Sequence, residues 1–359
     1  MVRLVTPEHI VREEQRAAVW HRIVPPTPAD AGGCATDAFR ASGLDYALRL
    51  DPLPTPPGMG WTVNRRMVVR PATEADPVSR ILGVVSDKYR IIQNGEIAAA
   101  LDPVLRKNGW MVDACGDIGF GSRLFISIDT GADKIAGEDY KNYLIVGDTR
   151  NGGSGQGRAL TVAAVPYRMA CANSLNYGLR KAAWTIRVGH QRDIVGNFAR
   201  ALGDLDRVRE EQAAVKEALE VLAGARIKDG QARAIIESAF PLPPARPRTA
   251  AVDPGVPLGQ QEAARRLRER FGVAKVASDV DYSEFEARAR SLRLTGEELY
   301  ERFNAAHPRV AGTAYAAFQV VAEIVDHRSD GSRNARAAVL GSGVEEKARA
   351  FRAALTLAR

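Results

Sequence analysis

Between residues 158 and 190 the chain carries basic and aromatic side chains but no carboxylate. The stretch holds four arginines, one lysine, two tyrosines and one tryptophan. Clustered Lys and Arg neutralise phosphates, and aromatic rings stack on nucleobases without reading their sequence. These residue types predict a binding site for single-stranded nucleic acid, and we expect the ligand to be DNA. The predicted site residues are Arg158, Arg168, Tyr177, Arg180, Lys181, Trp184 and Arg187.

The charge of the chain is concentrated around the same stretch. The formal net charge is +7, and residues 150–200 contain eight Lys and Arg side chains against one carboxylate, Asp193. The whole excess therefore lies in about fifty residues, which is typical of a surface that binds a polyanion. A solvated basic face with no ligand is the alternative interpretation of the same pattern.

Two other classes of function fit parts of the sequence. Asp129, Asp139 and Lys141 have the loose spacing of a metal-dependent nuclease, although acidic residues near hairpin ends more often serve solubility. A protein that presents its basic face to an acidic host protein is the third hypothesis. Cys171 could act as a nucleophile only with a base beside it, and no His or Asp lies near it in the sequence. His190 could approach it in the folded chain, but a buried cysteine without a catalytic role is expected. We expect no catalytic residue, no metal and no cofactor.

Composition places the chain among cytoplasmic globular proteins. It has three widely separated cysteines and five histidines without metal-binding spacing. The first twenty residues lack the apolar region of a secretory signal, and no run of eighteen apolar residues could span a bilayer. The glycine-rich residues 151–157 precede a strand pattern and lack the Lys-Ser/Thr of a phosphate-binding loop, so a flexible hairpin is expected there.

The elements that would position the basic residues form an α+β fold. A helix is expected over residues 6–22, followed by an arm rich in Pro and Gly with little core of its own, over residues 24–60. Short β-favouring runs indicate a mostly antiparallel sheet with helices packed on it; they lie at 61–70, 80–86, 109–115, 122–129, 140–148, 158–169 and 184–190. A helix is predicted at 94–107, with Pro103 as a kink, and a shorter one near Ala172.

After His190 the pattern becomes helical. Apolar residues at alternating steps of three and four predict a helix with a seam that needs a partner, either within the chain or in a homo-oligomer; the seam is Leu205, Val208, Gln212, Val215, Leu219 and Leu222. A Pro-rich linker at 240–259 separates an appended helical domain with helices at 260–272, 282–291, 295–306, 312–326 and 344–357. The predicted domains are an N-terminal helix and arm (1–60), an α+β core (61–240), a linker (241–258) and a helical domain (259–359).

Three stretches carry a resemblance to a known family. They are "VVSDKYRIIQNGEI" (84–97), "VPYRMACANSLN" (165–176) and "GTAYAAFQVVAEIVDHRS" (312–329), the last followed by "AVLGSG" (338–343). In these stretches the chain resembles the phage/plasmid-like protein family, domain of unknown function 932. The residues that match its two clearest patterns are Ser86, Asp87, Tyr89, Gln93, Asn94 and Glu96, and then Arg168, Cys171, Asn173, Ser174 and Leu175.

The resemblance implies a protein of a phage, plasmid or other mobile element. The arrangement of a sheet, a basic face and appended helices is also similar, more weakly, to that of phage single-strand annealing proteins. We therefore expect a non-catalytic protein that binds single strands and promotes annealing or recombination. Gln93, Asn94 and Asn173 are expected to orient backbone at strand-to-helix turns rather than to contact a ligand.

Overall fold

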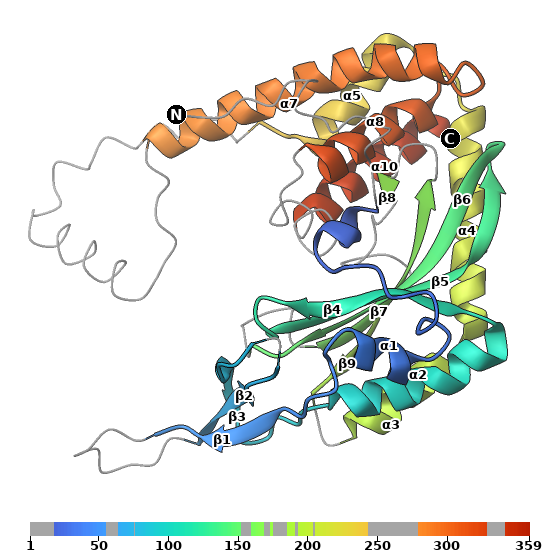
Figure 1. Cartoon of the computed structure of the whole chain (residues 1–359). Helices are drawn as coiled ribbons and strands as arrows, with labels where there is room; N and C mark the ends of the chain where they lie inside the picture. Colours follow the sequence, from blue (N-terminus) through green and yellow to red (C-terminus); the bar gives the residue numbers. More distant parts are fainter. Residues whose placement is uncertain are drawn as a thin grey trace, which may run out of the picture.

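The computed structural model describes residues 18–54, 64–74, 76–151, 159–168, 173–174, 185–190, 193–203, 205–242, 279–328 and 342–359. Its centre is a six-stranded antiparallel sheet with helices on both faces (Figure 1), so the α+β prediction is confirmed. The strands are β4 (Met111–Ile118), β5 (Arg123–Ile135), β6 (Glu138–Thr149), β7 (Ala159–Arg168), β8 (Asn173–Ser174) and β9 (Thr185–Gly189). Each of the seven β-favouring runs overlaps a strand of the structure, and β4, β5 and β6 extend beyond the predicted runs.

One face of the sheet is covered by three helices, α1 (Ala35–Ala41), α2 (Asn94–Asn108) and α3 (Ile194–Gly203). Helix α2 follows its prediction: Gln93 and Glu96 form a capping box at its start, and Gly109 ends it with a φ of 66°. The apolar side of α2 packs on Ile126 and Leu144 of the sheet in one buried cluster. This layer contains Tyr46 and Asn94, which contact Arg150 just before the basic stretch.

The segment expected to be an arm contributes to this layer. Residues 24–60 include α1 and the short strand β1 (Arg49–Pro52), and Phe39 and Leu44 are buried in the core. The expectation of little core there was therefore wrong. Pro and Gly are typical of the turns between such short elements, while Ala35, Ala38, Phe39, Leu44 and Leu48 are buried.

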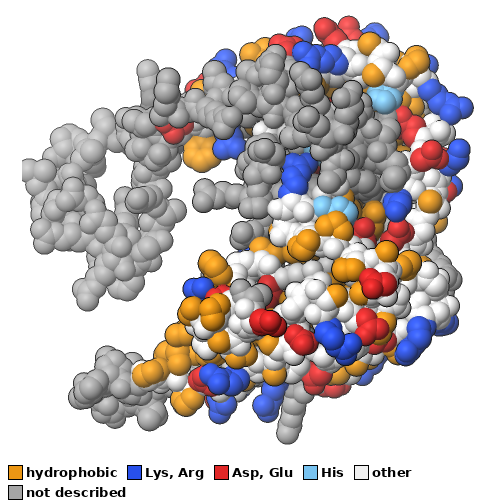
Figure 2. Space-filling view, viewed as in Figure 1, with side chains coloured by type: hydrophobic (Ala, Val, Ile, Leu, Met, Phe, Trp, Pro, Cys, Tyr) orange, Lys and Arg blue, Asp and Glu red, His pale blue; other side chains and the backbone are white. Residues whose placement is uncertain are grey.

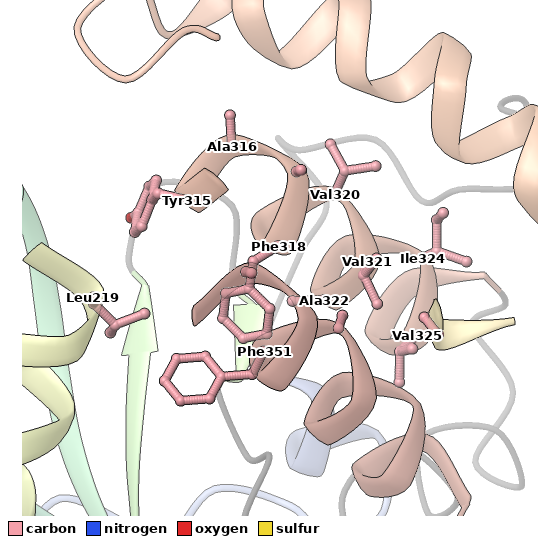
Figure 3. Packing of buried hydrophobic residues seen from close by; sticks show 14 of the residues in the cluster. Leu219, Tyr315, Ala316, Phe318, Val320, Val321, Ala322, Ile324, Val325 and Phe351 are labelled. Atoms are coloured by element: carbon pink, nitrogen blue, oxygen red, sulfur yellow. The ribbon is translucent and has the colours of Figure 1, made fainter. Parts of the chain in front are cut away.

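The opposite face of the sheet packs on a helical layer. Its members are α4 (Leu205–Gly224), α5 (Asp229–Ala239), α7 (Asp279–Ala306), α8 (Ala314–His327) and α10 (Ser342–Ala358). Helix α8 is buried all round, and Phe318 meets Phe351 of α10 edge to face at 5.3 Å between ring centroids (Figure 3). Leu219 and Leu222 of the predicted seam are buried against these helices, so α4 finds a partner within its own chain.

Two features of this layer differ from the predictions or lie beyond the described residues. The helices expected at 282–291 and 295–306 are one continuous helix, α7. The Pro-rich linker and the helix predicted at 260–272 lie outside the described residues, but α5 before them packs directly on α8 and α10 after them. Within the described residues, no helix is both long and apolar enough to cross a membrane.

A small sheet lies beside the large one. Its strands β1, β2 (Arg65–Arg70) and β3 (Arg80–Ser86) are antiparallel in the order β1-β2-β3. The backbone of Gly83 in β3 touches the backbone of Asn151, so closely that a Cβ on Gly83 would lie 2.1 Å from the Asn151 carbonyl oxygen. This contact fixes the chain where it leaves β6 toward the basic stretch.

The N-terminal segment is fastened to the sheet by one carboxylate. Of the helix expected at 6–22, only residues 18–22 are described, and Val19–Arg22 form a 3₁₀ turn. Trp20 is buried and donates its indole N–H to Asp113 Oδ2 at 2.8 Å; His21 lies 3.0 Å from the same oxygen, and Ser127 donates to it at 2.8 Å. Burial raises the pKa of Asp113, but the hydrogen bonds from His21, Trp20 and Ser127 outweigh it, so the pKa is lowered.

The lowered pKa of Asp113 gives a pH-dependent contribution to stability. A carboxyl with a depressed folded-state pKa stabilises the fold above its unfolded-state pKa, near pH 4, and this stability is lost as the pH falls through the folded-state value. We expect Asp113→Asn to flatten the acid limb of stability by up to about 1.4 kcal/mol per pH unit. Urea unfolding between pH 6 and 2 measures this. The exposed Asp37→Asn variant is the control, and equal acid limbs for wild type and Asp113→Asn would contradict the assignment.

Candidate functional site

The structure places part of the predicted nucleic-acid site. Arg187 is exposed in β9, and Arg168 is the last residue of β7. Arg158, Tyr177, Arg180, Lys181 and Trp184 lie outside the described residues, as do Cys171, the helix expected near Ala172 and most of the glycine-rich loop.

The described strands of the basic stretch lie along one edge of the large sheet. β7 pairs with β6 on one side; on its other side it pairs with β9 at Ala159–Ala163 and with β8 at Tyr167–Arg168. Arg168 ends β7, a strand of ten residues about 30 Å long. Arg187 pairs with Thr161 near the start of β7. The candidate site is therefore an extended edge and not a single pocket.

Two of the eight basic residues counted in the sequence do not add to this surface. Arg150 is buried in ion pairs with Asp148 and Asp117, and Arg200 lies 4.0 Å from Asp193. The other six basic residues of the stretch are Arg158, Arg168, Arg180, Lys181, Arg187 and Arg192. Elsewhere, on the face shown in Figure 2, basic and acidic side chains of the described residues are intermixed.

A buried carboxylate holds both ends of the basic stretch. Asp148 Oδ2 accepts from Arg150 Nε at 2.9 Å, and Asp148 Oδ1 lies 2.8 Å from His190 Nε2, an ion-pair contact whose angle is not that of a hydrogen bond. We call Asp148, Arg150 and His190 the Asp148 cluster. Burial raises the pKa of Asp148, but the contacts with His190 and Arg150 outweigh it and lower the pKa. The residues that flank 151–189 on either side, Arg150 and His190, therefore both contact the Asp148 carboxylate.

The guanidinium of Arg150 connects the Asp148 cluster to Tyr46 and to α2, on the face of the sheet covered by α1, α2 and α3. It donates to the Asn94 side-chain oxygen and to Tyr46 Oη at 3.3 Å, and it lies 3.6 Å from Asp117 Oδ1. Tyr46 in turn donates to Asp117. Burial raises the pKa of Asp117, a shift that Arg150 and Tyr46 partly offset. Asp148 Oδ1, Asp117 Oδ1 and His190 Nε2 are in close charge contacts and make no hydrogen bond among the described residues. The Asp148 cluster is buried, and we interpret it as a structural support.

The residues of the first sequence pattern build this support. The Gln93 side chain both accepts from and donates to the Leu48 backbone, at 2.8 and 3.0 Å, and Asn94 donates to the Leu44 carbonyl at 2.7 Å. Both therefore orient backbone, as predicted. The ring of Tyr89 stacks on His190 with centroids 4.5 Å apart. Sequence reasoning missed the Asp148 cluster, although Asp148 and Arg150 are two residues apart at the end of a strand and so share one face.

The match to a known family covers this support and the helical layer together. The family model described as Domain of unknown function (DUF932) matches residues 81–354, about three quarters of the chain. The chain belongs to the DUF932 family. No curated protein and no solved structure gives a significant match. The similarity in arrangement to single-strand annealing proteins therefore stays a prediction for this DUF932 protein.

The third sequence pattern of this DUF932 protein also serves the core. At the end of α8, Asp326 accepts from Lys347 Nζ at 2.9 Å, with both side chains fully buried. His327 Nδ1 accepts from Arg22 at 2.7 Å, and Arg328 pairs with Glu346 at 3.1 Å. The Asp-His pair thus joins α8 to α10 and to the N-terminal segment.

The residues of the nuclease alternative do not form one site in the DUF932 fold. Lys141 pairs with Asp129 at 3.0 Å, whereas Asp139 pairs with Lys134, five residues further along β5 and about 17 Å away from Asp129. Among the described residues there is no group of three metal-binding side chains. The distances give this alternative no support.

Proposed function

We propose that this DUF932 protein is a non-catalytic, cytoplasmic protein of phage or plasmid origin that binds single-stranded DNA and promotes annealing or recombination. The strand is bound along the sheet edge of β7, β8 and β9. One observation carries the proposal: residues 158–190 combine basic and aromatic side chains with no carboxylate, and the described strands of this stretch all lie on this edge. No carboxylate other than Asp193 falls within residues 150–200.

The shape of the edge favours a flexible single strand as the ligand. A strand of ten residues spans about 30 Å, a length suited to several nucleotides, and single-strand sites cover about 4–16 nucleotides per module. Tyr177 and Trp184 lie between β8 and β9 in the chain, where stacked bases would meet them. Duplex recognition commonly uses a helix inserted into the major groove.

A titration at several salt concentrations tests the proposal. A fluorescent oligothymidine of about twenty nucleotides and a matched duplex are each titrated with the protein, and binding is followed by fluorescence anisotropy. The single strand should bind more tightly, and its affinity should fall with salt because bound phosphates release counterions. Negligible affinity for both oligonucleotides at low salt would overturn the proposal.

Single substitutions locate the binding edge. Each of Arg187→Ala and Arg168→Ala should weaken binding for every oligonucleotide sequence and lower the slope of log K against log salt by about 0.7 per lost phosphate contact. Arg352→Ala is the matched control, because Arg352 is exposed on α10 of the helical layer. If the control changes the slope as much as Arg187→Ala does, the bound surface lies elsewhere.

A further inference from the structure

Phe120, in the turn between β4 and β5, has an aromatic ring that is not buried in the core. Phe120 is 68% exposed, and its φ of 59° is in the left-handed region, between Gly119 at 63° and Gly121 at 96°. A left-handed conformation costs a bulky residue free energy that glycine avoids. Because the ring is largely exposed, the free energy gained by burying it offsets little of this cost. The reason for a phenylalanine here therefore lies outside the packing of the chain.

The guanidinium of Arg80, which its neighbours hold in place, lies over one face of the Phe120 ring. The guanidinium carbon of Arg80 lies 4.7 Å from the Phe120 centroid, within the range of a cation–π contact. Arg80 donates two hydrogen bonds to Asp76, at 3.1 and 3.2 Å, and buried Arg70 holds Asp76 from the other side. The turn itself packs on Arg70, since a Cβ at Gly121 would lie 2.7 Å from its side chain. The ring is thus held in place although it is largely exposed.

The turn lies beside the origin of the basic stretch. The Ser122 carbonyl accepts the backbone N–H of Arg150 at 2.9 Å, and the next residue, Asn151, rests on Gly83 of β3. From Asn151 the chain proceeds to Arg158 and β7. The strand register pairs Phe125 with Gly147, Gly147 with Thr161 and Thr161 with Arg187, so the turn that holds Phe120 lies at the same end of the sheet as Arg187.

We propose that Phe120 is a base-stacking residue of the nucleic-acid site, with Arg80 behind the ring and a nucleobase of the bound single strand on its open face. This inference rests on the proposed function and adds a contact from an element far from the basic stretch in sequence. A flat, exposed π-face backed by a cation is suited to any of the bases, because each base has a π-face of its own. Phe120 contributes no phosphate contact.

An oligonucleotide with and without bases tests the stacking directly. Phe120→Ala should bind oligothymidine about 5- to 150-fold more weakly than wild type, the range that loss of one base stack produces. On an oligonucleotide of the same length with abasic residues throughout, Phe120→Ala and wild type should bind equally. The salt slope should be the same for both proteins, since no phosphate contact is lost.

Three further variants separate stacking from other effects. Phe120→Trp should keep the affinity for oligothymidine, and Phe285→Ala should leave it unchanged, because Phe285 is 64% exposed on α7. Phe120→Gly should lose affinity as Phe120→Ala does while unfolding at the same or a higher temperature, because glycine accepts the left-handed backbone.

The outcomes distinguish this inference from the proposed function. If wild type binds oligothymidine and Arg187→Ala weakens it, but Phe120→Ala binds normally or loses equally on the abasic strand, the stacking role alone is overturned. If wild type binds no oligonucleotide at low salt, the proposed function and the stacking role both fall.

Discussion

Arg150→Ala is expected to lower the free energy of unfolding by about 3–5 kcal/mol. Asp148 is fully buried and Asp117 largely so, and removal of the guanidinium leaves both carboxylates without their shared partner. It also removes the donors to Asn94 and Tyr46. Uncompensated buried charge is among the most destabilising changes that a single substitution can make.

Urea unfolding followed by tryptophan fluorescence measures the effect of Arg150→Ala. Arg40→Ala is the matched control, because Arg40 forms an exposed ion pair with Asp37 at 3.0 Å, and such pairs contribute at most about 1 kcal/mol. Adding Asp148→Asn to an Arg150→Met background should recover part of the loss by removing one buried charge. Equal losses for Arg150→Ala and Arg40→Ala would show that the Asp148 cluster does not support the fold.

Asp326→Ala is expected to cost a similar amount, about 3–5 kcal/mol, in the helical layer. Lys347 is fully buried, and burial lowers its pKa even with Asp326 in place. Without that carboxylate the ammonium is buried with less compensation, so the lysine releases its proton in the folded state. The unfolded lysine keeps its proton up to about pH 10.4, so the stability of the variant should rise as the pH increases from 7 toward 10.

The pH dependence makes the Asp326→Ala prediction specific to Lys347. Urea unfolding of wild type and variant at pH 7, 8.5 and 10 measures it, and the gap between the two proteins should narrow with rising pH. The double variant Asp326→Ala/Lys347→Met should lose this pH dependence and recover stability, because no buried charge remains. A gap of constant size across the pH range would contradict the assignment.

The regular elements of this fold were largely accessible from the sequence, and the exceptions have physical causes. The capping box and the final glycine of α2 indicate both ends of this helix in the sequence. The break predicted between 291 and 295 does not exist: α7 runs from Asp279 to Ala306, and Leu292 within the expected break is buried in the helical layer. Gly296 of the same helix allows a close approach to α5, since a Cβ there would lie 2.6 Å from Ile236.

The candidate site was less accessible. Clustering of Lys and Arg identified residues 150–200, but the count treated Arg150 as a surface charge, whereas it is buried beside Asp148. That burial depends on contacts with Tyr46 and Asn94, which lie 104 and 56 residues away in the chain. Phe120 was missed because its role depends on backbone dihedral angles and on Arg80, and neither is visible in a pattern of residue types.

The attachment of residues 151–189 to one carboxylate has a consequence for how this family can diversify. Both ends of the stretch contact the Asp148 cluster; within it, β7 pairs with β6, and β8 and β9 pair with β7. These attachments use the buried cluster and the main chain, so they do not depend on the identity of exposed side chains such as Arg187. Substitutions at such exposed positions are therefore compatible with the same scaffold in other members of the family.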